Sequence, residues 1–392
     1  MTRPSRARIG ETIARHFLPL ALLGHAWGWA FYAALWLRDG KNPLLHFEGP
    51  HLLGMIPWKA TQYYVNYPEH GFVRRGLIGT LFHPIPVEHA PAAILALSLV
   101  SGGLAVLAFH LFFRAALRAT PADRRGYLHG LMAVVALSPL GLCQIAYDAG
   151  RYDVWGLILF LAAGVLLVRG HRVAVVLLTV LALLIHEGFA LYGAGPLVVL
   201  AFLREHRGRR LATPVDLLRA LAARPLGFPT LYAIVVAALT VALRIWGGSE
   251  AAGSVPFGNG HMVWSETSFA IMQPLDTVSR VTVSALAGLC LLAGVALMRA
   301  DPGRATPVLA ALAAPLLFYA AGGNWARFTH LQMMSLVIFA TLAVAWLDAR
   351  PPPQTSPARR LLPGLVLLLP LGPIGITEVF PYVRTALGML AG

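Results

Sequence analysis

Long apolar runs, divided by short polar stretches, are the feature that most limits how this chain of 392 residues can fold. The runs are about 15 to 25 residues long, and a helix needs about 20 apolar residues to cross the hydrocarbon core of a bilayer. Hydrophobic residues make up 57% of the chain and charged residues only 12%, against about 25% charged residues in a typical soluble domain. The strict alternation that marks membrane strands does not run through these segments. We therefore predict an all-α, polytopic membrane helical bundle.

The apolar runs predict about 10–11 transmembrane helices in one membrane domain that covers residues 1–392. The predicted helices are residues 17–37, 91–113, 127–146, 154–168, 173–187, 189–203, 229–246, 280–298, 306–322 and 331–347, with a last apolar segment at 361–380. Three longer connecting stretches remain, at 38–90, 204–228 and 247–279. The second of these predicts an amphipathic linker on the membrane surface, although a plain basic connector fits it equally well.

Positive charge is unevenly divided between the two sets of loops. The formal net charge of +14 is compatible by itself with nucleic-acid binding. However, 21 of the 31 Lys and Arg residues fall in one set of alternate loops, in short clusters, and the other ten fall in the opposite set. Cytoplasmic loops of membrane proteins carry the excess of Lys and Arg. We therefore expect no nucleic-acid partner, a cytoplasmic N-terminus, and a periplasmic location for the 38–90 and 247–279 loops.

Polar residues interrupt three of the apolar runs, at 147–153, 186–188 and 324–330. Ionisable groups within membrane segments are costly and are kept mainly for function. With the orientation above, all three interruptions face outward, on the same side as the long 38–90 loop. The sequence therefore predicts one composite site at the outer membrane face.

The 38–90 loop contains an arginine pair, Arg74 and Arg75, followed by an apolar stretch at 77–82 that fits a short interfacial helix. Guanidinium groups bind phosphate oxygens through paired donors, so the pair predicts recognition of phosphate or pyrophosphate. Contact with anionic lipid is the alternative. Glu69, five residues before the pair, is a candidate general base for an acceptor hydroxyl. Its alternative role is to neutralise one of the two arginines.

The turn at 147–153 contains Asp148, Arg151 and Asp153. If the preceding helix continues through the turn, Asp148 and Arg151 share one face at i, i+3 spacing and can pair. A second carboxylate so near leaves one aspartate to contact the substrate or to catalyse. The alternative is that it caps the helix that follows.

His186 and Glu187 end an apolar run. Position 190 is Ala, so the pair lacks the second histidine of the HExxH motif, which argues against a zinc protease. We expect the pair to orient a catalytic group or to bind sugar hydroxyls, unless His186 only bonds a neighbouring helix. Cys143 and Cys290 both lie inside apolar runs and imply no disulfide or metal framework. The sequence therefore predicts neither a metal nor a cofactor.

The third interruption places Asn324, Arg327 and His330 on one helix face by their i, i+3, i+6 spacing. Arg327 would supply a second phosphate contact, and Trp325 a stacking surface for a sugar ring. The alternative is that these polar side chains hold neighbouring helices together.

This pattern resembles the GT-C superfamily of membrane glycosyltransferases and the related EpsG/Wzy-type polysaccharide polymerases. The resemblance covers most of the chain and rests on a first outer loop with Glu69, the stretch 136–140 that leads to a turn with Asp148 and Asp153, and a hairpin at 173–203 with a polar break. It implies a polyprenyl-phosphate or polyprenyl-pyrophosphate sugar donor used at the outer face. It also implies that an acidic residue of the first outer loop, here Glu69, acts as the base.

The expected function is therefore that of a glycosyltransferase of the bacterial inner membrane that builds a cell-surface glycan or glycolipid. A glycan or lipid acceptor would attack the donor sugar through a hydroxyl group. The proton would pass to one of the carboxylates Glu69, Asp148 and Asp153. The leaving phosphate would be stabilised by the arginines Arg74, Arg75 and Arg327.

Two other functions stay open from the sequence. An O-antigen or exopolysaccharide polymerase or ligase would use a pyrophosphate-linked oligosaccharide in the same kind of site. A transporter or flippase of lipid-linked sugars would also carry polar residues in its helices. Transporters often have internal repeats and polar groups at the bilayer midplane, whereas the polar groups of this chain gather near one predicted face.

Overall fold

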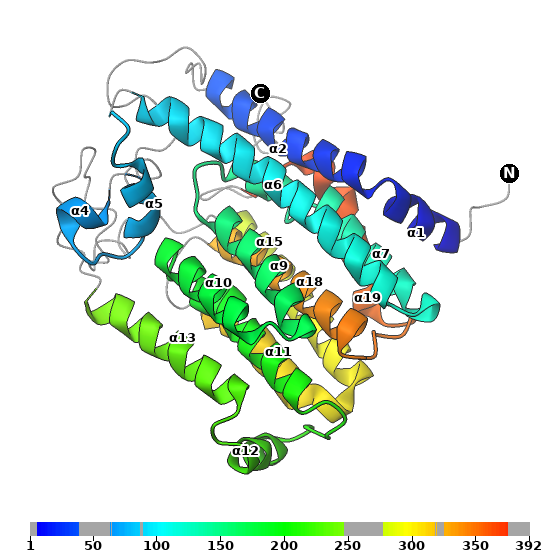
Figure 1. Ribbon diagram of the computed structural model, residues 1–392. Helices are drawn as coiled ribbons and strands as arrows, with labels where there is room; N and C mark the ends of the chain where they lie inside the picture. The colour runs from blue at the N-terminus through cyan, green and yellow to red at the C-terminus, as the bar shows by residue number, and fades with distance from the viewer. Residues whose placement is uncertain are drawn as a thin grey trace, which may run out of the picture.

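The computed structural model of the chain describes residues 6–38, 63, 65–86, 89–246, 277–317, 319 and 325–374. Over these residues the chain is helical and contains no strand. The α-helices are α1 (Arg6–Arg15), α2 (Phe17–Arg38), α4 (Tyr67–His70), α5 (Gly76–Phe82), α6 (Ala90–Ala119), α7 (Ala122–Leu137), α8 (Leu142–Tyr147), α9 (Asp153–Arg169), α10 (Arg172–Ile185), α11 (Gly195–Glu205), α12 (Pro214–Ala223), α13 (Phe228–Ile245), α15 (Thr277–Ala300), α16 (Ala305–Ala313), α18 (Trp325–Trp346) and α19 (Pro357–Gly364) (Figure 1). Short π or 3-10 segments are η2 (Ala190–Ala194), η4 (Pro302–Arg304), η5 (Ala314–Leu316) and η6 (Leu365–Leu371).

Five helical segments of the described chain are long and apolar enough to cross a membrane. They are Ala92–Ala119, Ala122–Tyr147, Phe228–Ile245, Val281–Ala300 and Arg327–Trp346. The all-helical class is thus confirmed over the described residues, and the membrane class is supported by these apolar helices. Helices α9, α10 and α11 have only 17, 14 and 11 residues, so the larger predicted number of crossings stays a prediction.

The outer surface of α6 carries a continuous stripe of large apolar side chains. Its exposed members recur at helical spacing and are Leu99, Val100, Leu104, Leu107 and Leu111. Soluble proteins seldom expose a contiguous apolar surface of this kind. Helices α10 and α13 also expose large aliphatic side chains along their length. These surfaces are suited to contact with lipid chains.

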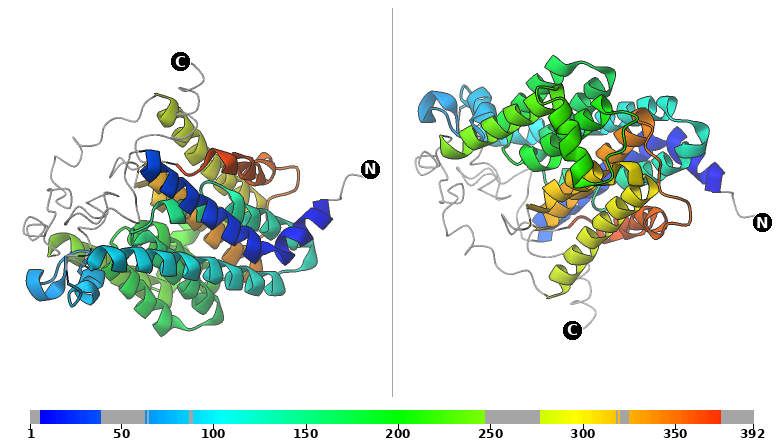
Figure 2. Two further views of the ribbon diagram at one scale, coloured as in Figure 1. Left: turned by 90° about the horizontal axis from the view of Figure 1, so that it is seen from above. Right: turned by 90° about the horizontal axis from the view of Figure 1, so that it is seen from below.

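Helix α18 forms the centre of the bundle, since every residue from 328 to 345 is buried. It contacts α6, α7, α9, α11 and α15. Figure 2 shows α18 in orange between the green helices α9–α13 on one side and α15 with α19 on the other. A helix that is apolar around its whole circumference is expected in such a position. Polar residues in its first turns are therefore brought into the interior.

The bundle has two ends with different accessory helices. Figure 1 shows α4 and α5 at one end, which we call the α4–α5 end, and α1 and α12 at the other, which we call the α1–α12 end. Helix α5 confirms the short helix predicted at 77–82. Helix α12 lies within the predicted 204–228 linker and begins with a capping box formed by Thr213 and Asp216. Most of the predicted loops 38–90 and 247–279 lies outside the described residues.

Prolines move several helix boundaries away from the predicted ones. The helix predicted at 127–146 is divided into α7 and α8, because Ser138 before Pro139 adopts an extended conformation with φ −107° and ψ 155°. A residue before proline is disfavoured in the α region. The helix predicted at 306–322 changes to a 3-10 turn at Ala314–Leu316, which contains Pro315, while Ala314 keeps a helical conformation. Helix α18 begins at Trp325, six residues before the predicted start.

Close contact between α2 and the α7–α8 pair depends on two glycines of α2 spaced four residues apart. A methyl group on Gly24 would overlap the backbone oxygen of Ala136, and one on Gly28 would overlap that of Cys143. We expect Gly28→Ala to lower the free energy of unfolding by about 1–3 kcal/mol, because two helix backbones must move apart. Unfolding of the purified protein in detergent would measure this.

The matched control is Gly103→Ala on α6, where a methyl group would meet nothing within 4 Å. There the loss of a helical glycine should leave stability unchanged or raise it by up to about 1 kcal/mol. Equal effects at positions 28 and 103 would contradict the close contact.

Candidate functional site

A buried ion pair joins the first residue of α9 to the first turn of α18. The carboxylate of Asp153 accepts two hydrogen bonds from Arg327, with 2.6 Å between Nη2 and Oδ1 and 2.5 Å between Nε and Oδ2. The two side chains are only 8% and 14% exposed. Nε2 of His186 lies 2.8 Å from Nη2 of Arg327 and 3.9 Å from Oδ1 of Asp153. The three predicted interruptions therefore meet, because Asp153 of 147–153 and His186 of 186–188 both contact Arg327 of 324–330.

His186 lies where α10 ends, in an extended conformation that turns the chain toward η2. Its Nδ1 accepts a hydrogen bond of 2.9 Å from the backbone N–H of Gly188. A neutral imidazole has a single acceptor nitrogen, so Gly188 and Arg327 compete for it. Burial, with the nearby charge of Arg75, lowers the pKa of His186 to about 4. The ring is therefore neutral at pH 7.

Glu187 binds Arg75 across 112 residues of sequence. Nε of Arg75 lies 3.0 Å from Oε2, and Nη2 lies 2.6 Å from Oε1. Burial by itself would raise the pKa of the Glu187 carboxyl, but the charge of Arg75 outweighs it and holds the pKa below its usual value. Arg75 has a left-handed backbone with φ 63° at the start of α5, a conformation that costs about 1–2 kcal/mol in a non-glycine residue. The bidentate pair helps to hold this turn against the end of α10.

The predicted pair between Asp148 and Arg151 is also present. Nε of Arg151 donates to Oδ1 of Asp148 over 2.9 Å; the Arg151 side chain is buried, and that of Asp148 is 11% exposed. The other oxygen, Oδ2, accepts from the side-chain amide of Gln144 over 2.9 Å. Gln144 in turn donates to the backbone oxygen of Ile374 and accepts from its N–H. The sequence analysis missed Gln144, although an amide inside an apolar run was a visible signal.

Two histidines bind backbone oxygens just after the break at Pro139. Nδ1 of His330 lies 2.7 Å from the oxygen of Leu140, and Nδ1 of His25 lies 3.2 Å from that of Leu142. Both histidines are buried. The alternative role for His330, a hydrogen bond between neighbouring segments, is therefore the one that the geometry supports.

Glu69 lies apart from these pairs, on the short helix α4. Its side chain is 57% exposed and accepts from the amide of Asn66 over 2.8 Å. Nδ1 of His83 is 3.6 Å away. Among the described residues, Glu69 has no hydrogen bond or ion pair with the buried carboxylates or their arginines. Asn324 and the side chain of Trp325 lie outside the described part of the structure, so their predicted roles stay predictions.

Arg74 and Arg244 add positive charge beside the Arg75–Glu187 pair. Burial lowers the pKa of Arg74; the charges of Arg75 and Arg244 lower it further, and Glu187 opposes them. Arg244 is in the last turn of α13 and was not among the predicted site residues. Among the described residues at this end, the interacting charges form one ion-pair cluster of five arginines and three carboxylates: Arg74, Arg75, Arg151, Arg244, Arg327, Asp148, Asp153 and Glu187. Its positive surplus suits an anionic ligand.

No family model, curated protein or solved structure matches the chain. The described residues also contain no group of three or more His, Cys, Asp or Glu side chains arranged to hold a metal ion. The chemistry of this end is therefore inferred from the ion-pair cluster and from Glu69. Arginine donors and carboxylates in water-poor surroundings can bind an anion and fix its orientation without rearrangement.

Removing one partner of the Asp153–Arg327 pair should destabilise the protein much more than removing both partners. We expect Asp153→Asn or Arg327→Met alone to lower the free energy of unfolding by about 3–5 kcal/mol, because each leaves a buried charge without its partner. The double variant should recover a large part of that loss. Equilibrium unfolding of the four proteins gives the interaction energy.

An exposed ion pair provides the comparison. Arg207 and Asp348 are paired at the α1–α12 end with side chains 58% and 56% exposed, so Arg207→Gln should cost less than about 1 kcal/mol. Additive losses in the Asp153 and Arg327 variants would show that the two charges do not depend on each other.

The buried neutral state of His186 predicts a pH dependence of stability. Its folded pKa of about 4 lies below the unfolded value near 6.5, so the unfolded chain binds the proton first as the pH falls. The stability that comes from this neutral ring is complete above pH 6.5 and declines toward pH 4, by at most about 1.4 kcal/mol per pH unit.

His186→Gln should flatten this part of the stability curve, as unfolding measured between pH 4 and pH 8 would show. His83→Gln is the control, because His83 has a 40% exposed side chain. If the two variants show the same pH dependence as the parent protein, the buried neutral histidine is not the cause.

Proposed function

We propose that this protein is an integral-membrane glycosyltransferase that uses a polyprenyl-linked sugar donor at the α4–α5 end of the bundle. The observation that carries the proposal is that, among the described residues, arginines outnumber carboxylates in the ion-pair cluster at the same end of the bundle as the exposed carboxylate of Glu69. A GT-C-like bundle of the bacterial inner membrane would place the more basic α1–α12 end in the cytoplasm and the cluster in the periplasm. The product would be a cell-surface glycan or glycolipid.

The pairing of the carboxylates separates their roles. Asp148, Asp153 and Glu187 each bind an arginine through hydrogen bonds of 3.0 Å or less, which favours their ionised form. A general base must accept a proton during the reaction, and such pairing opposes this. Glu69 is exposed, and among the described residues its carboxylate contacts the Asn66 amide and the more distant His83 ring. Glu69 is therefore the proposed base, and the two aspartates position the arginines.

The arginines beside Glu187 are proposed to hold the donor phosphate. Arg75 uses Nε and Nη2 for Glu187, which leaves Nη1 to bind a phosphate oxygen. Arg74 and Arg244 supply further positive charge at the same place. Because α4 and Arg74 belong to one short segment, the proposed base and the proposed phosphate site approach the substrate from the same side. Arg327, fixed by Asp153, would add longer-range stabilisation.

In the proposed reaction, an acceptor hydroxyl oxygen attacks the anomeric carbon of the donor sugar. The bond between that carbon and the phosphate oxygen breaks, and the phosphate leaves with the bonding electron pair. The hydroxyl proton passes to Glu69. The arginines lie where the leaving phosphate gains negative charge, whereas Glu69, which loses its negative charge when it takes the proton, has no arginine partner among the described residues.

The base is tested by Glu69→Gln, which removes the proton acceptor and preserves the shape. We expect transfer from polyprenyl-phosphate sugars to fall at least about 100-fold, with little change in unfolding temperature because Glu69 is exposed. Radiolabelled sugar transfer by the protein in proteoliposomes would measure it. The control is Asp123→Asn, an exposed carboxylate at the α1–α12 end, which should keep full activity.

The donor lipid separates the remaining alternatives. Activity only with polyprenyl-pyrophosphate oligosaccharides would identify a polymerase or ligase in place of a single-sugar transferase. Movement of the intact lipid-linked sugar between leaflets, without a new glycosidic bond, would identify a flippase and contradict the proposal. Full transfer activity in both Glu69→Gln and Asp153→Asn would remove both kinds of candidate base.

A further inference from the structure

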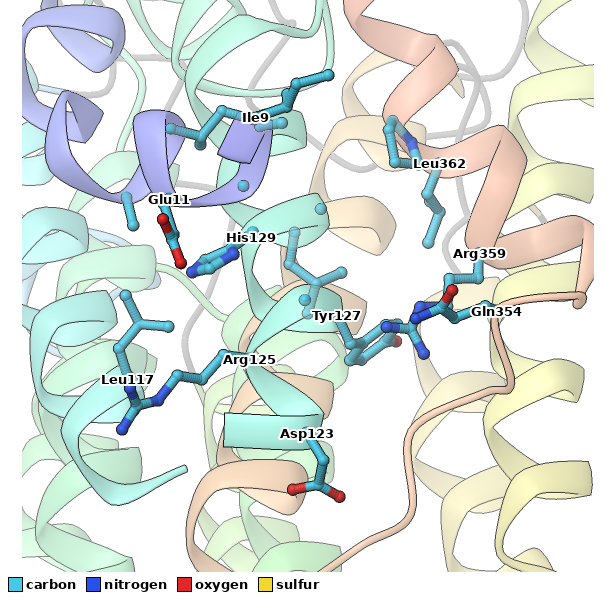
Figure 3. Close-up of a pocket in the computed structure, with 18 of the residues that line it drawn as sticks. Ile9, Glu11, Leu117, Asp123, Arg125, Tyr127, His129, Gln354, Arg359 and Leu362 are labelled. Carbon is cyan, nitrogen blue, oxygen red and sulfur yellow. The ribbon is translucent and has the colours of Figure 1, made fainter. Parts of the chain in front are cut away.

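A cavity of about 930 Å³ lies at the α1–α12 end, away from the ion-pair cluster and independent of the proposed transferase site. Its walls come from α1, the C-terminal part of α6, the N-terminal part of α7, and α19 (Figure 3). Four arginines and two carboxylates line it: Arg118, Arg125, Arg359, Arg360, Glu11 and Asp123. The cavity is therefore positively charged and has apolar walls between its polar groups.

Two glycines of α7 allow α19 to pack closely at one side of the cavity. Gly126 and Gly130 are four residues apart and so share one face of the helix. A methyl group on Gly126 would lie 3.4 Å from Nη2 of Arg359, and one on Gly130 would lie 3.5 Å from the Pro363 ring. The Arg359 guanidinium can therefore lie against α7. The open groove of the cavity lies beside these positions and is bordered by the apolar side chains of Ile9, Ile13 and Leu117.

The polar end of this groove has unused hydrogen-bonding capacity. The hydroxyl of Tyr127 is buried and, within the described chain, has no hydrogen-bond partner. The guanidinium of Arg359 lies over the same ring, 5.8 Å from its centroid, as Figure 3 shows beside Gln354. Arg359 donates one N–H to the backbone oxygen of Pro352. Among the described residues, neither Arg359 nor Arg360 forms an ion pair with a carboxylate.

We propose that this groove binds an anionic glycerophospholipid, with its phosphate at Arg359, Arg360 and the Tyr127 hydroxyl and an acyl chain against the apolar side chains of Ile9, Ile13 and Leu117. A buried hydroxyl without a partner costs free energy that a bound phosphate oxygen would recover. The guanidinium groups match phosphate geometry and charge. The apolar walls of the groove would cover the part of the acyl chain that is nearest to the phosphate. Basic pockets between membrane helices at the cytoplasmic face are suited to acidic lipids.

The hydroxyl gives the sharpest test. Tyr127→Phe should leave the lipid-free protein as stable as the parent, because the hydroxyl has no partner to lose. Its affinity for phosphatidylglycerol should nevertheless fall about tenfold. The control is Tyr232→Phe, since the buried Tyr232 hydroxyl lies 2.6 Å from Thr179 Oγ1. That variant should lose stability and keep its lipid affinity. Native mass spectrometry of lipid binding and unfolding in detergent would measure both.

Charge and shape are tested separately. The double variant Arg359→Gln with Arg360→Gln should weaken phosphatidylglycerol binding at least about tenfold. The control is Arg209→Gln with Arg219→Gln, which removes the same charge at the same end of the bundle and should change the affinity less than about twofold. Ile9→Trp keeps every charge and places a bulkier side chain in the groove, so it should also weaken binding. If the charge variants fold poorly, Ile9→Trp and Tyr127→Phe still decide the question.

The source of the phosphate is distinguished by the ligand used. Phosphatidylglycerol should raise the unfolding temperature in nanodiscs or detergent, phosphatidylcholine should not, and inorganic phosphate should bind far more weakly. If inorganic phosphate binds with equal affinity, the ligand of this groove is a soluble anion and not a lipid. Equal binding of both phospholipids, or equal losses in the cavity and control variants, would overturn the proposal.

Discussion

A guanidinium in the first turn of a buried helix requires an opposite charge close by, because an unpaired ion away from water costs several kcal/mol. Arg327 is in this situation on α18, whose residues 328–345 are all buried. Asp153 meets the requirement from the first residue of α9 and uses both oxygens. The position of α9 relative to α18 is thereby fixed at this end. His186 can reach the same pair only because α10 stops at Ile185 and the chain turns inward.

The same logic explains why the interruptions of the apolar helices are tolerated. A break in a helix leaves backbone oxygens without partners, and an apolar interior offers no water to bind them. Just after the Pro139 break, His330 binds the oxygen of Leu140, which precedes α8, and His25 binds that of Leu142 at the start of α8. Gln144 binds both backbone groups of Ile374, far away in sequence. Polar residues in the apolar runs are thus first a means of building irregular backbone inside a helical bundle.

What the sequence predicts well is local. The i, i+3 pairing of Asp148 with Arg151, the short helix after Arg75 and the polar break at His186 follow from helix geometry and composition. Partners that are distant in sequence cannot be predicted in this way, because they depend on how the helices pack. Examples are the pairs Arg75–Glu187 and Asp153–Arg327, and the approach of Arg244. The division of the third helix could have been predicted, because Pro139 stands in its middle. Spacing predicts the local partner of Asp148 but not the distant partner of Asp153, so Glu69, Asp148 and Asp153 all stayed candidate bases.

The two ends of the bundle use arginine in opposite ways, and this difference limits where chemistry can occur. At the α4–α5 end, buried arginines are tied to carboxylates, which makes the cluster rigid, and Arg74 and Arg244 add positive charge beside it. A rigid array of donors stabilises charge that develops in a reaction without reorganising. At the α1–α12 end, Arg359 and Arg360 have no carboxylate partner among the described residues and border an open groove. Arginines held in that way suit a ligand that stays bound, whereas those tied to carboxylates suit one that is bound, transformed and released.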